Sequence, residues 1–326
     1  MGKLIENTKT YTGEELLDIF LRPSFVGENA AALGIKVMPN VAVNTTVNFW
    51  QGKGNILKPY AKGWEGGDPT QMYQKTFEMT KIKAEKEFAA DDYKNTVFER
   101  ITNTAGVNLQ DLTGTDIEKA EIALFREAIA ESIRVTMWVG DKTKTVSKYE
   151  LFDGFLTKAA GYEGSHKVKL DAAPTDKTIK ATLDKVWKAA PKELKALKDT
   201  GKLVYFVSDD VFEAYESFLD GYTNTVAYNE LQLGRAALNY HGVEVRRMAV
   251  DSYINEEYID EKGSTHIILS HKDNLVFAMN TTDMPEAGVR MWYNPDEMEN
   301  RQRACFLAGT EFLDENIVVY ASTVIA

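Results

Sequence analysis

Residues 115–141 read TDIEKAEIALFREAIAESIRVTMWVGD and contain the strongest helical pattern of the chain. Thr115 and Glu118 form a capping box, in which two side chains satisfy backbone N–H groups at the start of a helix. Apolar side chains then recur at helical spacing, at Ile122, Phe125, Ile129 and Ile133, with Leu124 and Ala128 beside them. We predict a spine helix over residues 115–136 that ends before Gly140. At about 1.5 Å per residue it spans roughly 30 Å, enough to form the backbone of a domain.

Two strand-like runs precede this helix and are joined by a long loop. They read VAVNTTVNFWQ (41–51) and MYQKTFEMTKIK (72–83), and polarity alternates in parts of each. The stretch between them, GKGNILKPYAKGWEGGDP (52–69), is rich in Gly and Pro and far too long for a tight hairpin turn. We predict an extended β-loop over residues 41–83. Because it carries too few apolar residues for a core of its own, we expect it to rest on the body of the chain or on a neighbouring copy.

Two groups of side chains are candidates for contacts between copies. The first group is aromatic and stands on the β-loop, which cannot bury it alone: Phe49, Trp50, Tyr60 and Trp64. The alternative is that these rings fold back onto their own chain, but aromatic enrichment at interfaces favours the contact. The second group lies on the run MENRQRACFLAG (298–309), where one face carries charge and the other is apolar: Glu299, Arg301 and Arg303 against Ala304, Phe306 and Ala308.

The remaining segments complete an α+β organisation. Residues 1–40 hold a short helical pattern and an irregular run, which predicts an N-terminal arm. Helices and strands alternate over residues 153–280, where LVYFV (203–207) indicates a buried strand. The run 281–326 is rich in strands, and the spine helix needs a sheet to pack on. We therefore expect residues 84–152 and 281–326 to form one discontinuous domain into which residues 153–280 are inserted.

Composition narrows the classes of function. The chain has 326 residues, of which 44% are hydrophobic and 27% charged, so it can bury a large core, and its length predicts about two domains of ~150 residues. The net charge of −11 argues against a broad basic surface that holds nucleic acid, although a wall that only encloses DNA is compatible with it. Cys305 is the only cysteine, which fits a reducing cytoplasm. No apolar stretch of about 18 residues is present to span a bilayer.

Catalytic and metal-binding patterns are weak. The sequence contains no GxSxG, HExxH, P-loop or CxxC motif, and its four histidines are scattered. Two acidic runs are typical of solvated surfaces: Glu85, Glu87, Asp91 and Asp92, and Glu256, Glu257, Asp260 and Glu261. The lysines of residues 177–202 alternate with carboxylates, which predicts a salt-bridged surface helix and not a nucleic-acid patch. We assign no catalytic, cofactor-binding or metal-binding residue, and no cofactor.

The order of these parts resembles the major capsid protein of tailed bacteriophages, the Hong Kong ninety-seven fold that encapsulins share. An arm, an extended loop, a spine helix, an inserted axial α/β domain and strands returning to a peripheral domain follow that family's order along nearly the whole chain. Three pieces carry the resemblance locally: LVYFVSDDVFEAYESFL (203–219), ALNYHGVEVRRM (237–248) and MWYNPDEMENRQRACFLAGTEFLDENIVVYA (291–321).

The resemblance implies a structural protein and not an enzyme. Copies would form pentamers and hexamers of an icosahedral virion shell that encloses double-stranded DNA, assembled in the bacterial host cytoplasm without a membrane. A portal is an expected partner, and so is a separate scaffolding protein, because the arm begins near Met1. In this family the extended loop of one subunit lies across the peripheral domain of the next, and axial domains meet around five-fold and six-fold axes. We accordingly expect Glu65 or Asp68, at the loop tip, to meet Arg301 or Arg303 of a neighbour.

Two alternative functions stay open at the level of sequence. An encapsulin-like compartment would load an enzyme in place of a genome, and the contents of the particles would distinguish it. A cytoplasmic α/β enzyme that uses carboxylates would stay monomeric and would gather several acids in one concave pocket.

Overall fold

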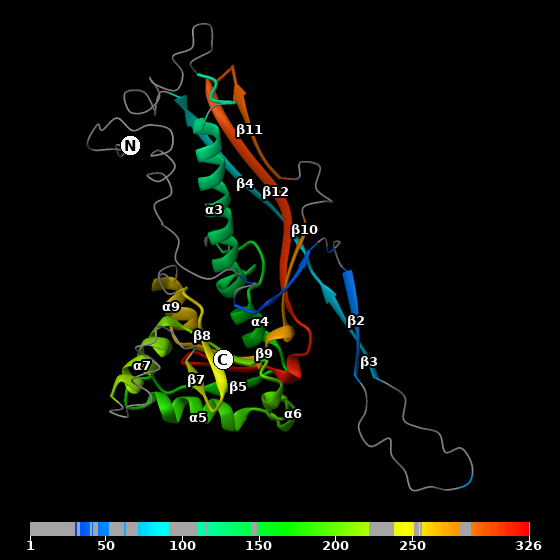
Figure 1. The fold of residues 1–326 in the computed structure, drawn as a ribbon, viewed down its shortest axis with the longest axis vertical. Coiled ribbons are helices and arrows are strands. Elements are labelled where there is room, and N and C mark those ends of the chain that lie inside the picture. The colour runs from blue at the N-terminus through cyan, green and yellow to red at the C-terminus, as the bar shows by residue number, and fades with distance from the viewer. Residues whose placement is uncertain are drawn as a thin grey trace.

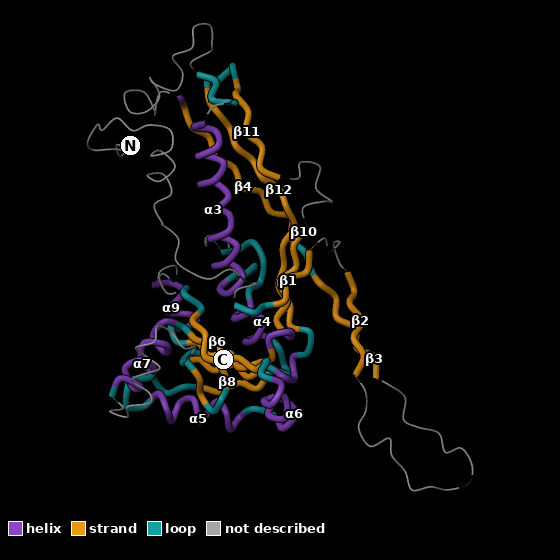
Figure 2. Tube along the Cα trace, viewed as in Figure 1, coloured by secondary structure: helices purple, strands orange, loops and turns teal. Residues whose placement is uncertain are grey.

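The fold is described from a computed structural model of the chain. The description covers residues 30, 33–39, 41, 45–51, 62, 71–90, 110–114, 116–144, 149–221, 238–250, 254, 256–280 and 288–325. Within these ranges a long helix, two sheets and a two-stranded ribbon make up an elongated molecule (Figures 1 and 2). The short helix predicted in the N-terminal arm lies outside the described residues.

The helix α3 (Asp116–Val139) forms the long axis of the body. It has 24 residues and runs beside the strands β11 and β12 (Figure 1). Ile117, Ala120 and Phe125 of α3 are buried. Ala128, which the sequence pattern placed beside the apolar face, is exposed. The predicted spine helix is therefore present and continues to Val139.

Five strands form the sheet next to α3: β1 (Lys36–Pro39), β4 (Thr80–Ala89), β10 (Leu275–Asn280), β11 (Gly288–Asn294) and β12 (Glu299–Phe312). The 14-residue β12 is its centre, because β4 pairs with it over Glu299 to Ala308, and β11 and β10 pair with its first and second halves. All these pairs are antiparallel, whereas β1 pairs with β10 in parallel. The end of the predicted arm is thus a strand of this sheet.

A six-stranded sheet forms the second part, in the order β5 (His166–Lys169), β13 (Val319–Ser322), β9 (His266–His271), β6 (Leu203–Val207), β8 (Val243–Arg247) and β7 (Asn239–Tyr240). Its helices are α4 (Phe155–Gly161), α5 (Ile179–Ala189), α6 (Lys192–Ala196), α7 (Asp209–Asp220) and α9 (Glu256–Lys262). Short 3₁₀ turns occupy Leu197–Thr200, Lys272–Asn274 and Glu315–Ile317. The strand predicted at LVYFV is β6, and all five of its residues are buried.

Two strands connect the sheets in a way that the sequence did not indicate. β10 falls within the predicted insertion 153–280, yet it pairs with β12 beside the spine helix. β13 falls within 281–326, yet it pairs with β5 and β9 in the six-stranded sheet. We expected residues 153–280 to belong to the inserted domain and residues 281–326 to the domain of the spine helix. This expectation is wrong for β10 and β13. The chain crosses between the sheets at Lys272–Asn274 and again after Phe312, and the domain division itself stays a prediction.

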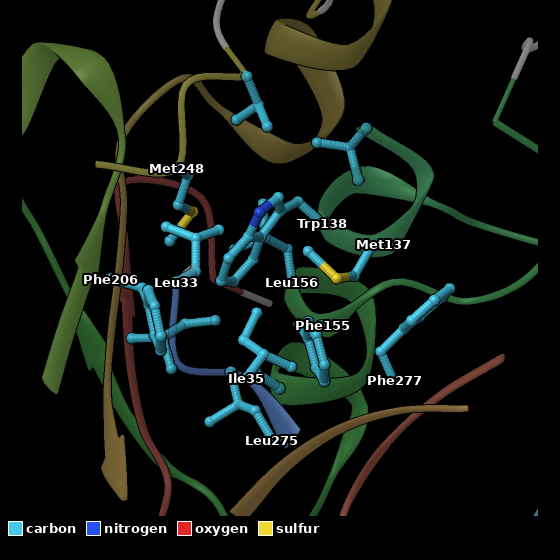
Figure 3. Packing of buried hydrophobic residues seen from close by; sticks show 14 of the residues in the cluster. Leu33, Ile35, Met137, Trp138, Phe155, Leu156, Phe206, Met248, Leu275 and Phe277 are labelled. Carbon is cyan, nitrogen blue, oxygen red and sulfur yellow. The ribbon is translucent and has the colours of Figure 1, made fainter. Parts of the chain in front are cut away.

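The two sheets share one apolar core at the C-terminal end of α3 (Figure 3). Trp138 is fully buried, and its ring centroid lies 5.5 Å from that of Phe155 on α4 and 5.1 Å from that of Phe206 on β6. Leu275 and Phe277 of β10 belong to the same cluster. Because one helix end fills the space between both sheets, we expect the body to move as a unit.

A buried arginine also connects α3 to the segment that follows β8. The Arg134 guanidinium lies 2.6 Å from Glu131 one turn earlier on α3, and both side chains are less than a tenth exposed. Arg134 also donates hydrogen bonds of 3.1 and 2.8 Å to the carbonyls of Met248 and Ala249, just beyond β8. These bonds satisfy a charge that would otherwise be costly to bury.

His266 occupies a fully buried position on β9. Its Nε2 lies 3.0 Å from the carbonyl of Gly263, and its Nδ1 lies 3.0 Å from the Tyr320 hydroxyl. A carbonyl only accepts, so Nε2 carries the proton and Nδ1 accepts from Tyr320. Burial lowers the pKa of His266 to about 4, because a charged imidazolium would lose its hydration there.

This shift predicts a loss of stability in mild acid. The unfolded chain takes up a proton near pH 6.5 and the folded chain only near pH 4, so the free energy of unfolding falls as the pH is lowered between these values, by roughly 1 kcal/mol per pH unit. Urea unfolding at pH 7 and pH 5 measures it. In His266→Gln the dependence should be shallower, because the amide does not titrate; burial also lowers the pKa of His271, which leaves a residual slope. Equal slopes in wild type and variant would contradict this account.

Candidate assembly interface

The predicted β-loop is a two-stranded ribbon that projects from the body. β2 (Thr45–Gln51) and β3 (Gln71–Phe77) pair antiparallel from Thr45 opposite Phe77 to Gln51 opposite Gln71. The ribbon extends away from the five-stranded sheet and stands apart from the six-stranded sheet (Figure 1). Phe49 and Trp50 lie on β2 opposite Tyr73 and Met72. Residues 80–83, predicted as part of the loop, instead begin β4, because they pair with β12.

The ribbon joins the body at a small apolar cluster. Phe77 at the end of β3 is 1% exposed, and Met79 is buried beside it. Both pack with Val276 and Ala278 of β10 and Leu307 of β12. The direction of the ribbon is therefore set where it leaves the sheet.

Gly309 on β12 permits this junction. A Cβ atom at this position would lie 2.5 Å from the backbone carbonyl oxygen of Glu78, which links β3 to β4. Real Cβ contacts are longer than this, so a side chain here would push the linker away from the sheet. The backbone of the ribbon base depends on this close approach.

A buried carboxylate holds the other side of the ribbon base. Glu311 of β12 accepts hydrogen bonds from Lys158, at 2.6 Å, and from the Tyr162 hydroxyl, and its side chain is 5% exposed. Lys75 of β3 places its Nζ 3.8 Å from Glu311 and 4.3 Å from the centroid of the Tyr162 ring. Burial and the nearby carboxylate raise the pKa of Tyr162, so its hydroxyl remains a donor. Lys75 of the ribbon is thus paired with Glu311 of the body.

The outward face of β12 has the predicted polarity. Glu299, Arg301 and Arg303 are half-buried, and they alternate with buried residues that include Ala304 and Phe306. Arg303 donates a 3.0 Å hydrogen bond to Glu85 on β4. Arg301 lies 3.7 Å from Glu87, also on β4, and pairs with Glu297 in the turn before β12. The charged face is therefore paired within its own chain.

An exposed tryptophan lies on the same face. Trp292 of β11 sits opposite Arg301 and is 37% exposed, and the Arg303 guanidinium lies 5.6 Å from its ring centroid. Arg290 is exposed and sits opposite Arg303; it forms no ion pair with another described residue. An exposed tryptophan with an arginine over its ring is typical of interface anchors.

The candidate residues from the sequence divide into three groups. Glu299, Arg301 and Arg303 lie together on β12, and Phe49 and Trp50 lie next to each other on the ribbon. Tyr60, Trp64, Glu65 and Asp68 lie outside the described residues, so their proposed contacts stay predictions. Sequence reasoning missed Lys75, Gly309, Glu311 and Trp292. A lone glutamate in the apolar run FLAGTEFL (306–313) was the available signal for Glu311.

Most of the acids considered for a carboxylate enzyme either have basic partners or lie outside the described residues. No group of three potential ligands is close enough there to hold a metal ion. Glu85 and Glu87 pair with arginines of β12, and Glu261 of α9 pairs with Lys144, so these acids do not converge. Asp91 and Asp92 lie outside the described residues. No described helix combines the length and apolar character needed to cross a membrane.

Comparison with known proteins identifies the fold. No family model and no curated sequence matches the chain. Solved structures do: a satellite phage P4 procapsid that includes the size determination (Sid) protein has a TM-score of 0.54 at 10% identity and covers 97% of this chain and 100% of that chain. The capsid of a native GTA particle has a TM-score of 0.55 at 14% identity, with 98% and 95% covered. The capsid of Myoviridae phage XM1 has 0.53 at 11%, with 92% and 94% covered.

These likenesses extend over almost the full length of both chains, so they concern the whole architecture and not one motif. The chain has the α+β fold of phage capsid proteins. The resemblance seen in the sequence is therefore confirmed at the level of fold.

The ribbon base yields a stability prediction. Gly309→Ala should lower the free energy of unfolding by roughly 1–3 kcal/mol, the usual range for overpacking, because the new methyl group meets the Glu78 carbonyl. Gly161→Ala at the end of α4 is the matched control, since a Cβ there meets nothing within 4 Å. Urea unfolding measures both. Equal stability of Gly309→Ala and Gly161→Ala would mean that the close approach at the ribbon base is not a constraint.

Proposed function

We propose that this protein is a major capsid subunit whose copies assemble as pentamers and hexamers into an icosahedral shell around double-stranded DNA. The observation that carries the proposal is the likeness of nearly the whole chain to phage capsid proteins. The subunit itself performs no chemistry in this account. A scaffolding protein and a portal are its further partners, as the family resemblance implies.

The ribbon is the part of the molecule that reaches the next copy. Two strands alone bury little surface, and such hairpins are marginal in water without a further partner. β2 and β3 are held to their own body at the base, through Phe77 and Lys75. The rest of the ribbon therefore gains stability by lying across a neighbour, with the aromatic residues Phe49, Trp50, Tyr60 and Trp64 as anchors.

The outward face of β11 and β12 is the surface proposed to receive it. Arg301 and Arg303 have carboxylate partners on their own chain, so an incoming acid shares these arginines with them. Arg290 beside Arg303 has no such partner among the described residues. Glu65 or Asp68 of the neighbour is proposed to meet this face, where Trp292 provides apolar contact.

Electron microscopy of the purified protein tests the proposal. Expression alone or with its scaffolding protein should give hollow particles of uniform size. Nucleic acid inside particles made during infection supports a phage shell, whereas a packaged enzyme indicates an encapsulin-like compartment. Small oligomers of fixed size under every condition would refute shell formation.

Charge reversal at the loop tip tests the proposed receiving face. Glu65→Lys combined with Asp68→Lys should reduce particle yield, because like charges then face the arginines of the neighbour. Asp171→Lys combined with Asp176→Lys is the matched control, since both acids are exposed and lie far along the chain from the ribbon. Particle counts per milligram of protein measure the effect. An unchanged yield in the loop variant rejects this pairing and leaves shell formation itself untouched.

A further inference from the structure

A lysine-rich surface covers one flank of the six-stranded sheet. Residues 179–200, which span α5, α6 and the 3₁₀ turn Leu197–Thr200, contain six lysines and three carboxylates in a chain of net charge −11. The sequence predicted that these charges pair with one another. The structure differs: Asp184 accepts from Tyr240 and from His241, at 3.3 Å. Asp184 is thus bound by Tyr240 and the β7–β8 turn, and Lys188 lies near enough to help lower the pKa of Asp184 without forming an ion pair with it.

Four of these lysines form what we call the α6 lysine surface: Lys188, Lys192, Lys195 and Lys198. Lys188, Lys192 and Lys198 are exposed and Lys195 is half-buried, and none has a carboxylate within ion-pair distance in the described part of the chain. With the exposed Glu193 and Asp199 among them, the four lysines still leave this segment net positive in a protein that is acidic as a whole. Such a surface attracts an acidic partner.

Trp187 holds part of this surface in place. The Nζ atoms of Lys195 and Lys198 each lie 6.0 Å from the centroid of the Trp187 ring, and the His241 ring stacks on it at 6.0 Å. Lys195 also donates a 3.2 Å hydrogen bond to the carbonyl of Lys188. Side chains that are already ordered lose less conformational entropy on binding. The surface is therefore prepared for a contact and differs from freely moving surface lysines.

An acidic helix, α7, packs beside α5 on the side away from α6 (Figure 1). α7 carries five carboxylates and no basic residue. Glu213, Glu216 and Asp220 are exposed and recur at helical spacing, so they share one face. Asp209 and Asp210 are instead used within the chain, by Arg247 and by Ser208 and Thr265. The exposed three make up the α7 acidic face.

The direction of the ribbon relates these two surfaces. Figure 1 shows α6 on the side of the six-stranded sheet toward the ribbon and α7 on the side away from it. In a ring of copies the neighbour that receives the ribbon stands on the α6 side. Head-to-tail contacts repeat one pair of unlike surfaces around the ring, so that neighbour turns its α7 side toward α6.

We propose that the α6 lysine surface of one copy binds the α7 acidic face of the next copy in the same ring. The inference rests on the proposed function and adds to it the residues that hold the α/β parts together. Its lysines and carboxylates remain partly hydrated at an exposed contact, so the interaction weakens as salt screens it. The ribbon and this contact then act at two separate places on the same pair of subunits.

Paired charge reversals test the contact. Lys195→Glu with Lys198→Glu, and separately Glu213→Lys with Glu216→Lys, should each lower particle yield on the order of tenfold at low salt, because like charges then face each other. The chain that carries all four changes should recover most of the yield. Lys177→Glu with Lys180→Glu, both exposed at the other end of the lysine-rich region, is the matched control. Recovery also shows that the reversed chains still fold.

A zero-length carbodiimide provides the second measurement. Wild-type particles made from equal parts of ¹⁵N-labelled and unlabelled chains should yield mixed-isotope cross-links between Lys192, Lys195 or Lys198 and Glu213, Glu216 or Asp220. The contact is overturned, while the capsid function stands, if the reversed chains form particles in normal yield and the wild-type particles lack these cross-links. A wild-type protein that forms no particles and no cross-links would overturn both.

Discussion

A pair of hydrogen-bonded strands has no core of its own, so the β2–β3 ribbon needs another surface to pack on. The β2–β3 ribbon is fixed at its base by Phe77 in an apolar cluster and by Lys75 at the buried Glu311. Beyond this base the strands extend away from the body (Figure 1). Among the described residues, the ribbon beyond its base therefore has no supporting surface in its own copy, and the proposed neighbouring copies supply one.

The body is built to hold that ribbon at a defined angle. One apolar core around Trp138 joins both sheets to the end of the spine helix, and Arg134 adds hydrogen bonds between α3 and the segment after β8. β12 connects this core to the ribbon. It pairs with β4, β10 and β11, and it carries Gly309 and Glu311 at the ribbon base. The ribbon base is thus in contact with paired strands of the sheet.

Much of this architecture was predictable from local patterns, whereas its cross-connections were not. The helix over residues 116–139, the strand at LVYFV and the alternation along β12 follow from periodicity, which a single segment contains in full. The placement of β10 and β13 depends on which strands pair with them, and the sequence of a single segment does not indicate its pairing partners. The same holds for the site: charged residues on β12 were visible in the sequence, but their partners Glu85 and Glu87 come from a strand more than 200 residues away.

The most direct test of the account is a reconstruction of the assembled particle by cryo-electron microscopy, at a resolution that traces the ribbon between residues 45 and 77. The account predicts that the strands beyond the base lie on the β11–β12 face of an adjacent subunit, with Trp292 covered in the contact. A ribbon that folds back and packs along its own subunit, with Trp292 open to solvent, would contradict it.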